Sequence, residues 1–337
     1  EDGGSCLDDN VSMSYRYTLN LNTSFTGKDL LYTRLRTGNM SNVWGQKDSQ
    51  LSDQKSSDNV LKVDKLWYSF PVGEEFKVTL GALVENYYMV ETPTRYKPIL
   101  KAFKLGGYGA LMGASTGQGA GIQWRQNVAP GEAAFNVAAN YVADGGEGAS
   151  SDSTKGMFGS ATDGYFLSQI GYGNRKWYVS GLYAHKQGAD GSDPAMGYST
   201  PAAKAQDEAL NVFGIRSYWS PEESGIVPTI SGGIDFGTSD ADAKDAVEDT
   251  FGWMVGLTWD DVFVEGNRLG AAVGSYSSYA TEIKGDSDPE DENFAFEVWY
   301  DYRVTDNVSV KPAVFYTSDA FGKATADGAN KFGALVQ

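Results

Sequence analysis

The stretch VSMSYRYTLNLNTSF, residues 11–25, decides the fold class of this chain. Its odd positions hold Val, Met, Tyr, Tyr, Leu, Leu, Thr and Phe, and its even positions hold Ser, Ser, Arg, Thr, Asn, Asn and Ser. Successive side chains of a strand point to opposite faces, so one face of this strand meets an apolar medium and the other meets water. Strands of soluble proteins usually run for about 5–6 residues, so alternation of this length favours the wall of a membrane barrel. The residues expected to face lipid are Met13, Tyr15, Tyr17, Leu19 and Leu21, and those expected to face water are Arg16, Asn20 and Asn22.

The same alternation recurs along the chain in pairs of segments that are joined by short turns. The turns follow Phe25, Phe70, Asn127, Tyr172, Trp219, Trp259 and Val304. Long polar connections separate the pairs, at 38–59, 85–118, 144–164, 187–208, 237–249, 278–293 and 318–330. Outer-membrane barrels have short periplasmic turns and long extracellular loops in this strict order. The sequence therefore predicts an all-β protein, with residues 1–337 forming a single transmembrane antiparallel β-barrel domain of about 16 strands.

Counting the predicted strands indicates that one strand precedes residue 1. The seven hairpins supply fourteen strands, and a segment from Lys331 to the end makes fifteen. Single-chain bacterial barrels have an even number of strands, with both termini on the periplasmic side. We therefore expect an upward strand before Glu1, which closes the barrel as the sixteenth. The alternative is a strand hidden around 104–112, which would reverse the direction of every later hairpin.

Composition excludes several classes of protein. The mean hydropathy is −0.37, and no stretch approaches the roughly 18 consecutive apolar residues of a membrane helix. A net charge of −17 argues against nucleic acid as a partner, because phosphates need a basic surface. One histidine and one cysteine leave too few ligands for a zinc site, so we expect no metal and no cofactor. A Ser–His catalytic pair would have to use His185, the one histidine of the chain, so we expect no enzyme. The alternative function is that of a soluble β-sandwich binding protein.

Three segments resemble the cyanobacterial outer-membrane porins, relatives of the OprB-like carbohydrate-selective family. They are residues 21–39 (LNTSFTGKDLLYTRLRTGN), 63–73 (VDKLWYSFPVG) and 308–317 (VSVKPAVFYT). The resemblance covers essentially the whole chain. It implies a homotrimeric barrel of sixteen strands, embedded in the lipid of the bacterial outer membrane, which passes small hydrophilic solutes and ions by passive diffusion. Members of this family are labelled either as carbohydrate porins or as iron-uptake porins.

The chain departs from this resemblance at both ends. Complete family members carry an N-terminal surface-layer-homology domain that binds cell-wall polysaccharide, and no segment here matches it. Barrels of this kind usually end on an aromatic residue, whereas this chain ends in Gln337. Both departures suggest a chain that is given without its true ends.

The candidates for pore selectivity are charged side chains at the alternate strand positions that are expected to face water. They are Arg16, Arg34, Arg36, Arg125, Arg216, Glu297, Asp301, Arg303 and Lys311. A basic wall opposite an acidic wall would produce a transverse field that orients solutes. The alternative is that these charges neutralise one another and only keep the pore wet.

The connection 86–118 differs from an ordinary outer loop. Its four cations, set against the single acid Glu91, are Arg95, Lys97, Lys101 and Lys104. It also contains Ile99, Leu100 and Phe103, apolar residues that an exposed loop would avoid. We expect this segment to fold into the barrel as a constriction loop and to produce a modest anion preference. The alternative is an outer loop packed at a contact between subunits.

Overall fold

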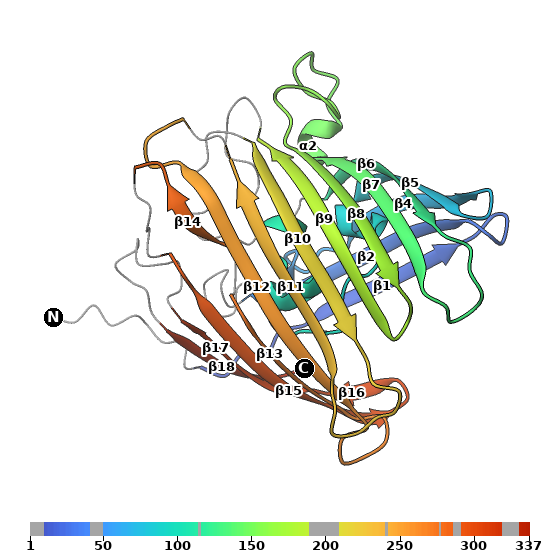
Figure 1. Cartoon of the computed structure of the whole chain (residues 1–337), viewed down its shortest axis with the longest axis vertical. Coiled ribbons are helices and arrows are strands. Elements are labelled where there is room, and N and C mark those ends of the chain that lie inside the picture. Colours follow the sequence, from blue (N-terminus) through green and yellow to red (C-terminus); the bar gives the residue numbers. More distant parts are fainter. Residues whose placement is uncertain are drawn as a thin grey trace.

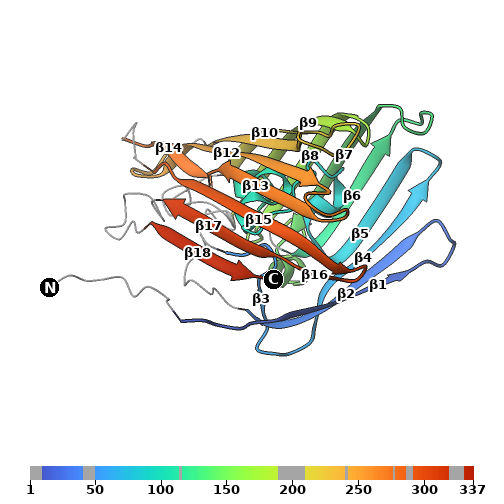
Figure 2. The same cartoon turned by 90° about the horizontal axis from the view of Figure 1, so that it is seen from below.

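The computed structural model describes residues 10–40, 50–113, 116–188, 209–239, 242–275, 278–285, 291–318 and 330–337. These residues form one antiparallel sheet of eighteen strands that curves into an open barrel (Figures 1 and 2). Most of the predicted loops 187–208 and 318–330 lies outside the described residues. No helix in the described ranges is both long and apolar enough to cross a lipid bilayer.

The strands follow the predicted hairpins closely. Their bounds are β1 Arg16–Thr23, β2 Leu30–Met40, β3 Lys55–Ser56, β4 Lys62–Val72, β5 Phe76–Val84, β6 Gly117–Arg125, β7 Ala134–Ala143, β8 Gly164–Gly173, β9 Trp177–Gln187, β10 Leu210–Trp219, β11 Thr229–Thr238, β12 Val247–Asp260, β13 Arg268–Gly274, β14 Tyr279–Ile283, β15 Phe294–Thr305, β16 Val308–Val310, β17 Pro312–Ser318 and β18 Lys331–Val336. The helical segments are η1 Asn86–Met89, η2 Lys101–Gly106, α1 Gly109–Met112 and α2 Gly145–Gly148.

Each wall strand pairs with its neighbour in sequence, so the topology is a simple meander. β3 has only two residues, β13 and β14 pair with successive parts of β12, and β16 and β17 pair with successive parts of β15. Counted in this way, the eighteen strands amount to fifteen wall strands, and the predicted fold class is confirmed. In the described chain, β1 pairs with β2 but not with β18, so the sheet is open between β1 and β18. The sixteenth strand stays a prediction. The alternative strand at 104–112 is wrong, because those residues belong to η2 and α1.

Large apolar side chains are exposed on the outer face of the sheet, whereas polar and charged side chains lie on the inner face, together with apolar residues that pack against residues 86–113. On β10, Phe213 and Ile215 are each 52% exposed, whereas Arg216 beside them is fully buried. On the neighbouring β11, Ser231 and Asp235 are buried. A soluble β-sandwich has the opposite distribution, because the apolar faces of its two sheets pack together. The sandwich alternative is therefore wrong.

The first strand has the predicted orientation. β1 is Arg16–Thr23, so the fifteen-residue strand predicted over 11–25 is wrong in length. Tyr17, Leu19 and Leu21 of β1 are exposed, and so are Met13 and Tyr15, which precede it. On the inner face, the Tyr32 hydroxyl donates a hydrogen bond to Asn20 at 2.8 Å. The Arg16 guanidinium contacts the Asp53 carboxylate at 2.6 Å, also on the inner side. The contacts of Arg16 and Asn20 therefore agree with the predicted inner face, and the position of Asn22 stays a prediction.

A capped turn joins β1 to β2. The Asp29 carboxylate accepts hydrogen bonds from the Ser24 hydroxyl at 2.7 Å, the Thr26 amide at 2.8 Å and the Tyr68 hydroxyl at 2.6 Å. These donors, with Ser24 contributing most, hold the pKa of Asp29 well below its ordinary value. Gly27 adopts a φ of 81°, a conformation that few other residues tolerate. The short turn is thus specified by its own side chains.

The outward position of Leu19 can be tested with a charge. Leu19 pairs with Leu35, the middle residue of β2, so it lies near the middle of the membrane. We expect Leu19→Lys to lower the free energy of unfolding by about 2–4 kcal/mol, measured by urea unfolding in lipid vesicles. Asn22→Lys is the matched control, because Asn22 shares the inner parity of Asn20 and pairs with Tyr32. Equal losses for the two variants would contradict the assignment of the faces.

Candidate functional site

Residues 86–113 fold into the interior of the curved sheet (Figure 2). Here η1 contacts β6, β7 and β8, η2 contacts β11 and β12, and α1 contacts β9, β10 and β11. Ile99, Leu100 and Phe103 are fully buried against the wall. The apolar residues that made this segment unlike an outer loop are therefore the ones that attach it to the inner face. We call residues 86–113 the inner loop.

One attachment is a carboxylate that collects donors from the inner loop. Glu297 on β15 accepts hydrogen bonds from the Tyr96 hydroxyl at 2.8 Å, the Ile99 amide at 2.9 Å and the Leu100 amide at 2.6 Å. The Trp299 indole N–H donates to the Tyr96 hydroxyl at 2.9 Å. Glu297 is fully buried, so it was predicted on the correct face but lies beneath the loop.

A second attachment lies on β9, β10 and β11. Arg216 forms a fully buried ion pair with Asp235 and donates to the Gly107 carbonyl at 3.0 Å. The Lys186 ammonium donates to the Gly113 carbonyl. Glycine is required at position 233, because a Cβ there would collide with the Gly106 carbonyl. Arg216, like Glu297, is therefore covered by the inner loop.

A second connection between strands also contacts the inner loop. Residues 50–56 lie between β2 and β4 and include β3. Leu51 forms a β-bridge with Leu100, and the Ser52 amide donates to the Ile99 carbonyl at 2.6 Å. The Lys101 amide donates to the Gln50 carbonyl at 2.9 Å. Two segments far apart in sequence thus meet inside the barrel.

A cavity of about 450 Å³ lies between these two segments and the wall strands β1, β2 and β4. We call it the charged cavity. Its lining residues are Arg16, Arg34, Arg36, Gln50, Ser52, Asp53, Gln54, Lys55, Ser56, Asp64, Lys65, Glu85, Tyr87, Lys101, Lys104, Tyr108 and Thr116. Among the described residues of this lining, seven are cations and three are carboxylates, which gives a net charge of +4. The whole chain carries −17, so the described lining of this cavity has the opposite sign.

Asp64 is the centre of the charged cavity. Its carboxylate contacts the Arg34 Nε at 2.6 Å, the Lys55 ammonium at 2.8 Å, the Arg36 guanidinium at 3.7 Å and the Lys65 ammonium at 3.8 Å. One carboxylate therefore serves four cations. Because a single negative charge neutralises only one of them, this part of the wall stays strongly positive.

A β-bulge explains why Lys65 was missed in the sequence. Strict alternation places Lys65 on the same face as Val63, which is 49% exposed. The register between β2 and β4 shifts after Arg34, so Arg34 pairs with Lys65 while Leu35 pairs with Val63. A bulge adds one residue and turns the following side chains to the other face. Lys65 thus points inward, 3.5 Å from Glu85. Lys55 and Asp53 were missed for another reason, since they lie in a connection without periodicity.

Aromatic rings form a band beside the charged cavity. Tyr32 stacks on Trp67 with ring centroids 4.9 Å apart, and Tyr87 stacks on Tyr88 at 4.8 Å. The centroids of Trp67 and Tyr88 are 5.9 Å apart, so the band crosses from the wall to the inner loop. The Tyr88 hydroxyl accepts a hydrogen bond from Arg34 at 2.8 Å. The rings therefore hold part of the charged cavity in shape.

The predicted pore residues fall into three groups. Those that line the charged cavity are Arg16, Arg34, Arg36, Lys101 and Lys104. Those that the inner loop covers are Arg216 and Glu297. Those that lie elsewhere are Arg95, Lys97, Arg125, Asp301, Arg303 and Lys311. In this last group, Asp301 contacts Arg268 at 2.7 Å and Arg303 contacts Asp306 at 3.0 Å.

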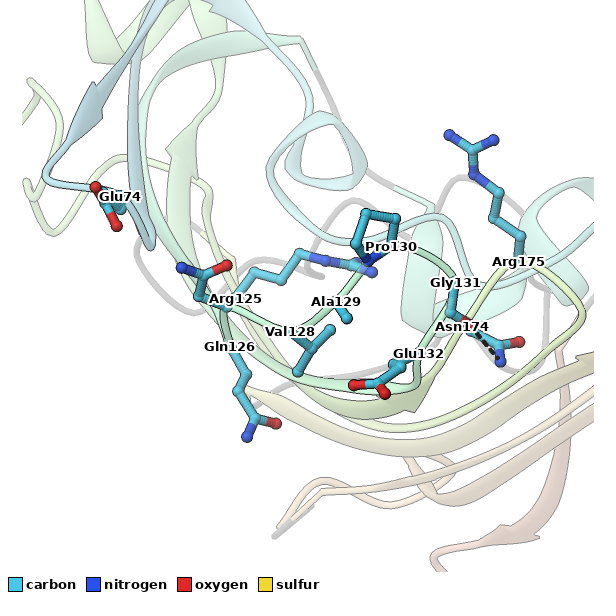
Figure 3. Close-up of a pocket in the computed structure, with 11 residues that line it drawn as sticks. Glu74, Arg125, Gln126, Val128, Ala129, Pro130, Gly131, Glu132, Asn174 and Arg175 are labelled. Carbon is cyan, nitrogen blue, oxygen red and sulfur yellow. Dashed lines mark hydrogen bonds between the residues drawn. The ribbon is translucent and has the colours of Figure 1, made fainter.

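A turn-side cavity of about 630 Å³ lies among the turns that follow β4, β6 and β8 (Figure 3). Its charged residues are Glu74, Arg125, Glu132 and Arg175, so the charges balance. Arg125 also contacts Glu91 of the inner loop at 3.4 Å. Glu75 in the first of these turns accepts hydrogen bonds from the Asn127 amide and the Trp124 indole, each at 3.0 Å, which lowers its pKa. The turn-side cavity is larger than the charged cavity, and it shows no excess of either sign.

An antiparallel sheet that curves into a barrel, with an apolar outer surface and a charged cavity inside, is the architecture of a porin of the bacterial outer membrane. The sequence pattern of the carbohydrate-selective porin OprB family matches residues 10–333. This chain belongs to that family. Porins of this family are channels in the bacterial outer membrane, and the chain is located there.

The chain is also similar to individual proteins and solved structures. An uncharacterized protein of Synechocystis is 25% identical over 351 residues, which cover 92% of this chain and 60% of the relative. The chain spans about 60% of the length of the curated relatives that it matches. The structure of OprB from Pseudomonas putida has a TM-score of 0.62 at 12% identity and covers 96% of this chain and 86% of that chain. The structure of an anion-selective porin from Comamonas acidovorans has a TM-score of 0.55 at 13% identity, and the match covers 95% of this chain and 87% of that chain. At such identities the likeness shows the fold alone.

Proposed function

We propose that this chain is a general porin for small hydrophilic solutes and inorganic ions, in which the charged cavity determines a preference for anions. The observation that carries the proposal is the +4 lining of that cavity inside a chain of net charge −17. Carboxylates in outer loops that lie beyond a Debye length of about 8 Å from a permeating ion are largely screened from it. The ion therefore responds mainly to the cations that line its path.

The inner loop is the constriction in this proposal. Its Lys101 and Lys104 line the charged cavity together with Arg34 and Arg36 on β2. A passage lined by charges on both sides selects by sign as well as by size. The proposed mechanism needs no chemistry on the solute, so the chain acts as a channel and not as an enzyme. The homotrimer and the contact with cell-wall polysaccharide stay predictions from the resemblance.

The proposal is tested with the purified protein in planar lipid bilayers and in liposomes. We expect stepwise increases in conductance in KCl, and a reversal potential in a KCl gradient that favours chloride. Liposomes should swell in small neutral sugars and not in large oligosaccharides, because the charged cavity limits size. Heat-unfolded protein is the control and should form no channels. A folded protein that gives neither steps nor swelling would contradict the proposed function.

A further inference from the structure

Among the described residues that line it, the charged cavity has more cations than carboxylates. Its cations are Arg16, Arg34, Arg36, Lys55, Lys65, Lys101 and Lys104, and its carboxylates are Asp53, Asp64 and Glu85. Asp53 contacts Arg16 at 2.6 Å, Glu85 contacts Lys65 at 3.5 Å, and Asp64 is shared by four cations. Like charges held at this density repel one another unless an anion lies between them.

We infer that the charged cavity is a binding site, along the proposed passage, for a small oxyanion of two negative charges, namely phosphate or a phosphate monoester. The inference rests on the proposed porin function and names a class of solute for it. A phosphate group has three or four acceptor oxygens and accepts several charge-assisted hydrogen bonds at once, which a chloride ion does less well.

Among the described residues, Arg36 forms a single, long ion pair. Its nearest carboxylate oxygen, on Asp64, lies at 3.7 Å, beyond hydrogen-bond distance. Its Nε atom is buried and has no hydrogen-bond partner within the described part of the chain. A buried donor without a partner costs free energy, and an incoming oxygen would remove that cost. The planar guanidinium also matches two oxygens of one phosphate.

Donors reach the charged cavity from three separate elements. Arg36 comes from β2, Lys55 from β3 and Lys104 from η2 of the inner loop. Because both loops are fixed to each other by the bridge between Leu51 and Leu100, their cations are held in place before a solute arrives. A site that is ordered in advance loses less entropy on binding.

Two tyrosine rings lie beside these cations. The Lys104 ammonium lies 4.8 Å from the centroid of Tyr87, and the Lys101 ammonium lies 5.1 Å from the centroid of Tyr108. Tyr108 is buried, and Tyr87 is half-buried with one face stacked on Tyr88, so a sugar ring attached to the phosphate would contact the exposed part of Tyr87. Tyr87 thus provides the difference between free phosphate and a sugar phosphate.

The test is the chloride current of single channels in planar bilayers, titrated with potassium phosphate, glucose 6-phosphate or glucose. We expect phosphate and glucose 6-phosphate to reduce the current along a saturable curve, and glucose to have no such effect at equal concentration. Arg36→Gln should weaken the block about tenfold, because one charge-assisted hydrogen bond is lost. Lys104→Gln should act in the same direction from the inner loop, and it carries the test if Arg36→Gln does not fold. Lys28→Gln is the matched control, since Lys28 is exposed in the turn between β1 and β2 and should leave the block unchanged.

The possible outcomes distinguish a failure of the proposed binding site from a failure of the proposed porin function. A normal chloride current without a saturable block by either phosphate would overturn this inference and leave the porin function intact. The absence of any ion current from folded protein would overturn the porin function itself. Tighter block by glucose 6-phosphate than by phosphate would support a sugar phosphate as the solute, and equal block would support free phosphate. Equal weakening in Lys28→Gln and Arg36→Gln would refute the assignment to the charged cavity.

Discussion

Replacing Glu297 with alanine should detach part of the inner loop and make the channel wider and noisier. Glu297 is buried and accepts from Tyr96, Ile99 and Leu100. Without it, two buried backbone N–H groups lose their acceptor, at about 1–3 kcal/mol for each. That cost shifts the balance between attached and detached loop by roughly tenfold or more. The wall strands keep their own ladder hydrogen bonds, so the barrel itself should still fold.

Single-channel recording measures this effect directly. In the Glu297→Ala channel we expect a larger mean conductance and more frequent transitions between levels than in the parent. Asp301→Ala is the matched control, because it removes another inward carboxylate of β15 whose partners Arg268 and Lys311 lie outside the inner loop. If the conductance and noise of Glu297→Ala equal those of the parent, the inner loop is not the constriction.

Arg34→Glu should reduce the anion preference strongly. Arg34 lines the charged cavity, and the substitution changes the charge of its lining by two units, from +4 to +2. A unit charge about 4 Å from an ion contributes about 1 kcal/mol in water and about 4 kcal/mol at an effective dielectric constant of 20. A change of two units should therefore alter the ratio of chloride to potassium permeability by at least about tenfold.

Reversal potentials in a KCl gradient measure this ratio. Lys101→Glu places the same change on the opposite side of the charged cavity, and we expect a shift in the same direction. Arg303→Glu is the matched control, because it changes the charge equally at a half-exposed position that contacts Asp306 and does not line the charged cavity. A similar shift for Arg303→Glu would mean that selectivity depends on the net charge of the protein and not on the charged cavity.

Much of the fold followed from local patterns. The alternation in residues 11–25 defined the two faces of β1, and the short turns, such as the one after Phe25, placed the hairpins. The strict order of short turns and long loops distinguished a barrel from a sandwich. These features can be read from sequence because the side-chain period of a strand is fixed by backbone geometry.

The details of the candidate site were predicted less well from the sequence than the fold was. Arg216 and Glu297 were placed on the inner face correctly, yet both bind the inner loop and are closed to water. Parity identifies the face of a strand, but it contains no information about what covers that face. Lys65 was missed because a bulge changed the parity of β4. Bulges depend on the partner strand, which a single sequence does not identify.

The sequence by itself determined the fold class, the direction of most wall side chains and the unusual character of the inner loop. The tertiary structure alone decided which charges face one another. Asp64 serves four cations only because β2, β3 and β4 come together there, and Lys104 approaches from a segment that is about forty residues further along the chain. Electrostatic energy depends on distances between side chains in space, which fall within a few ångströms only when the loop is folded back onto the wall.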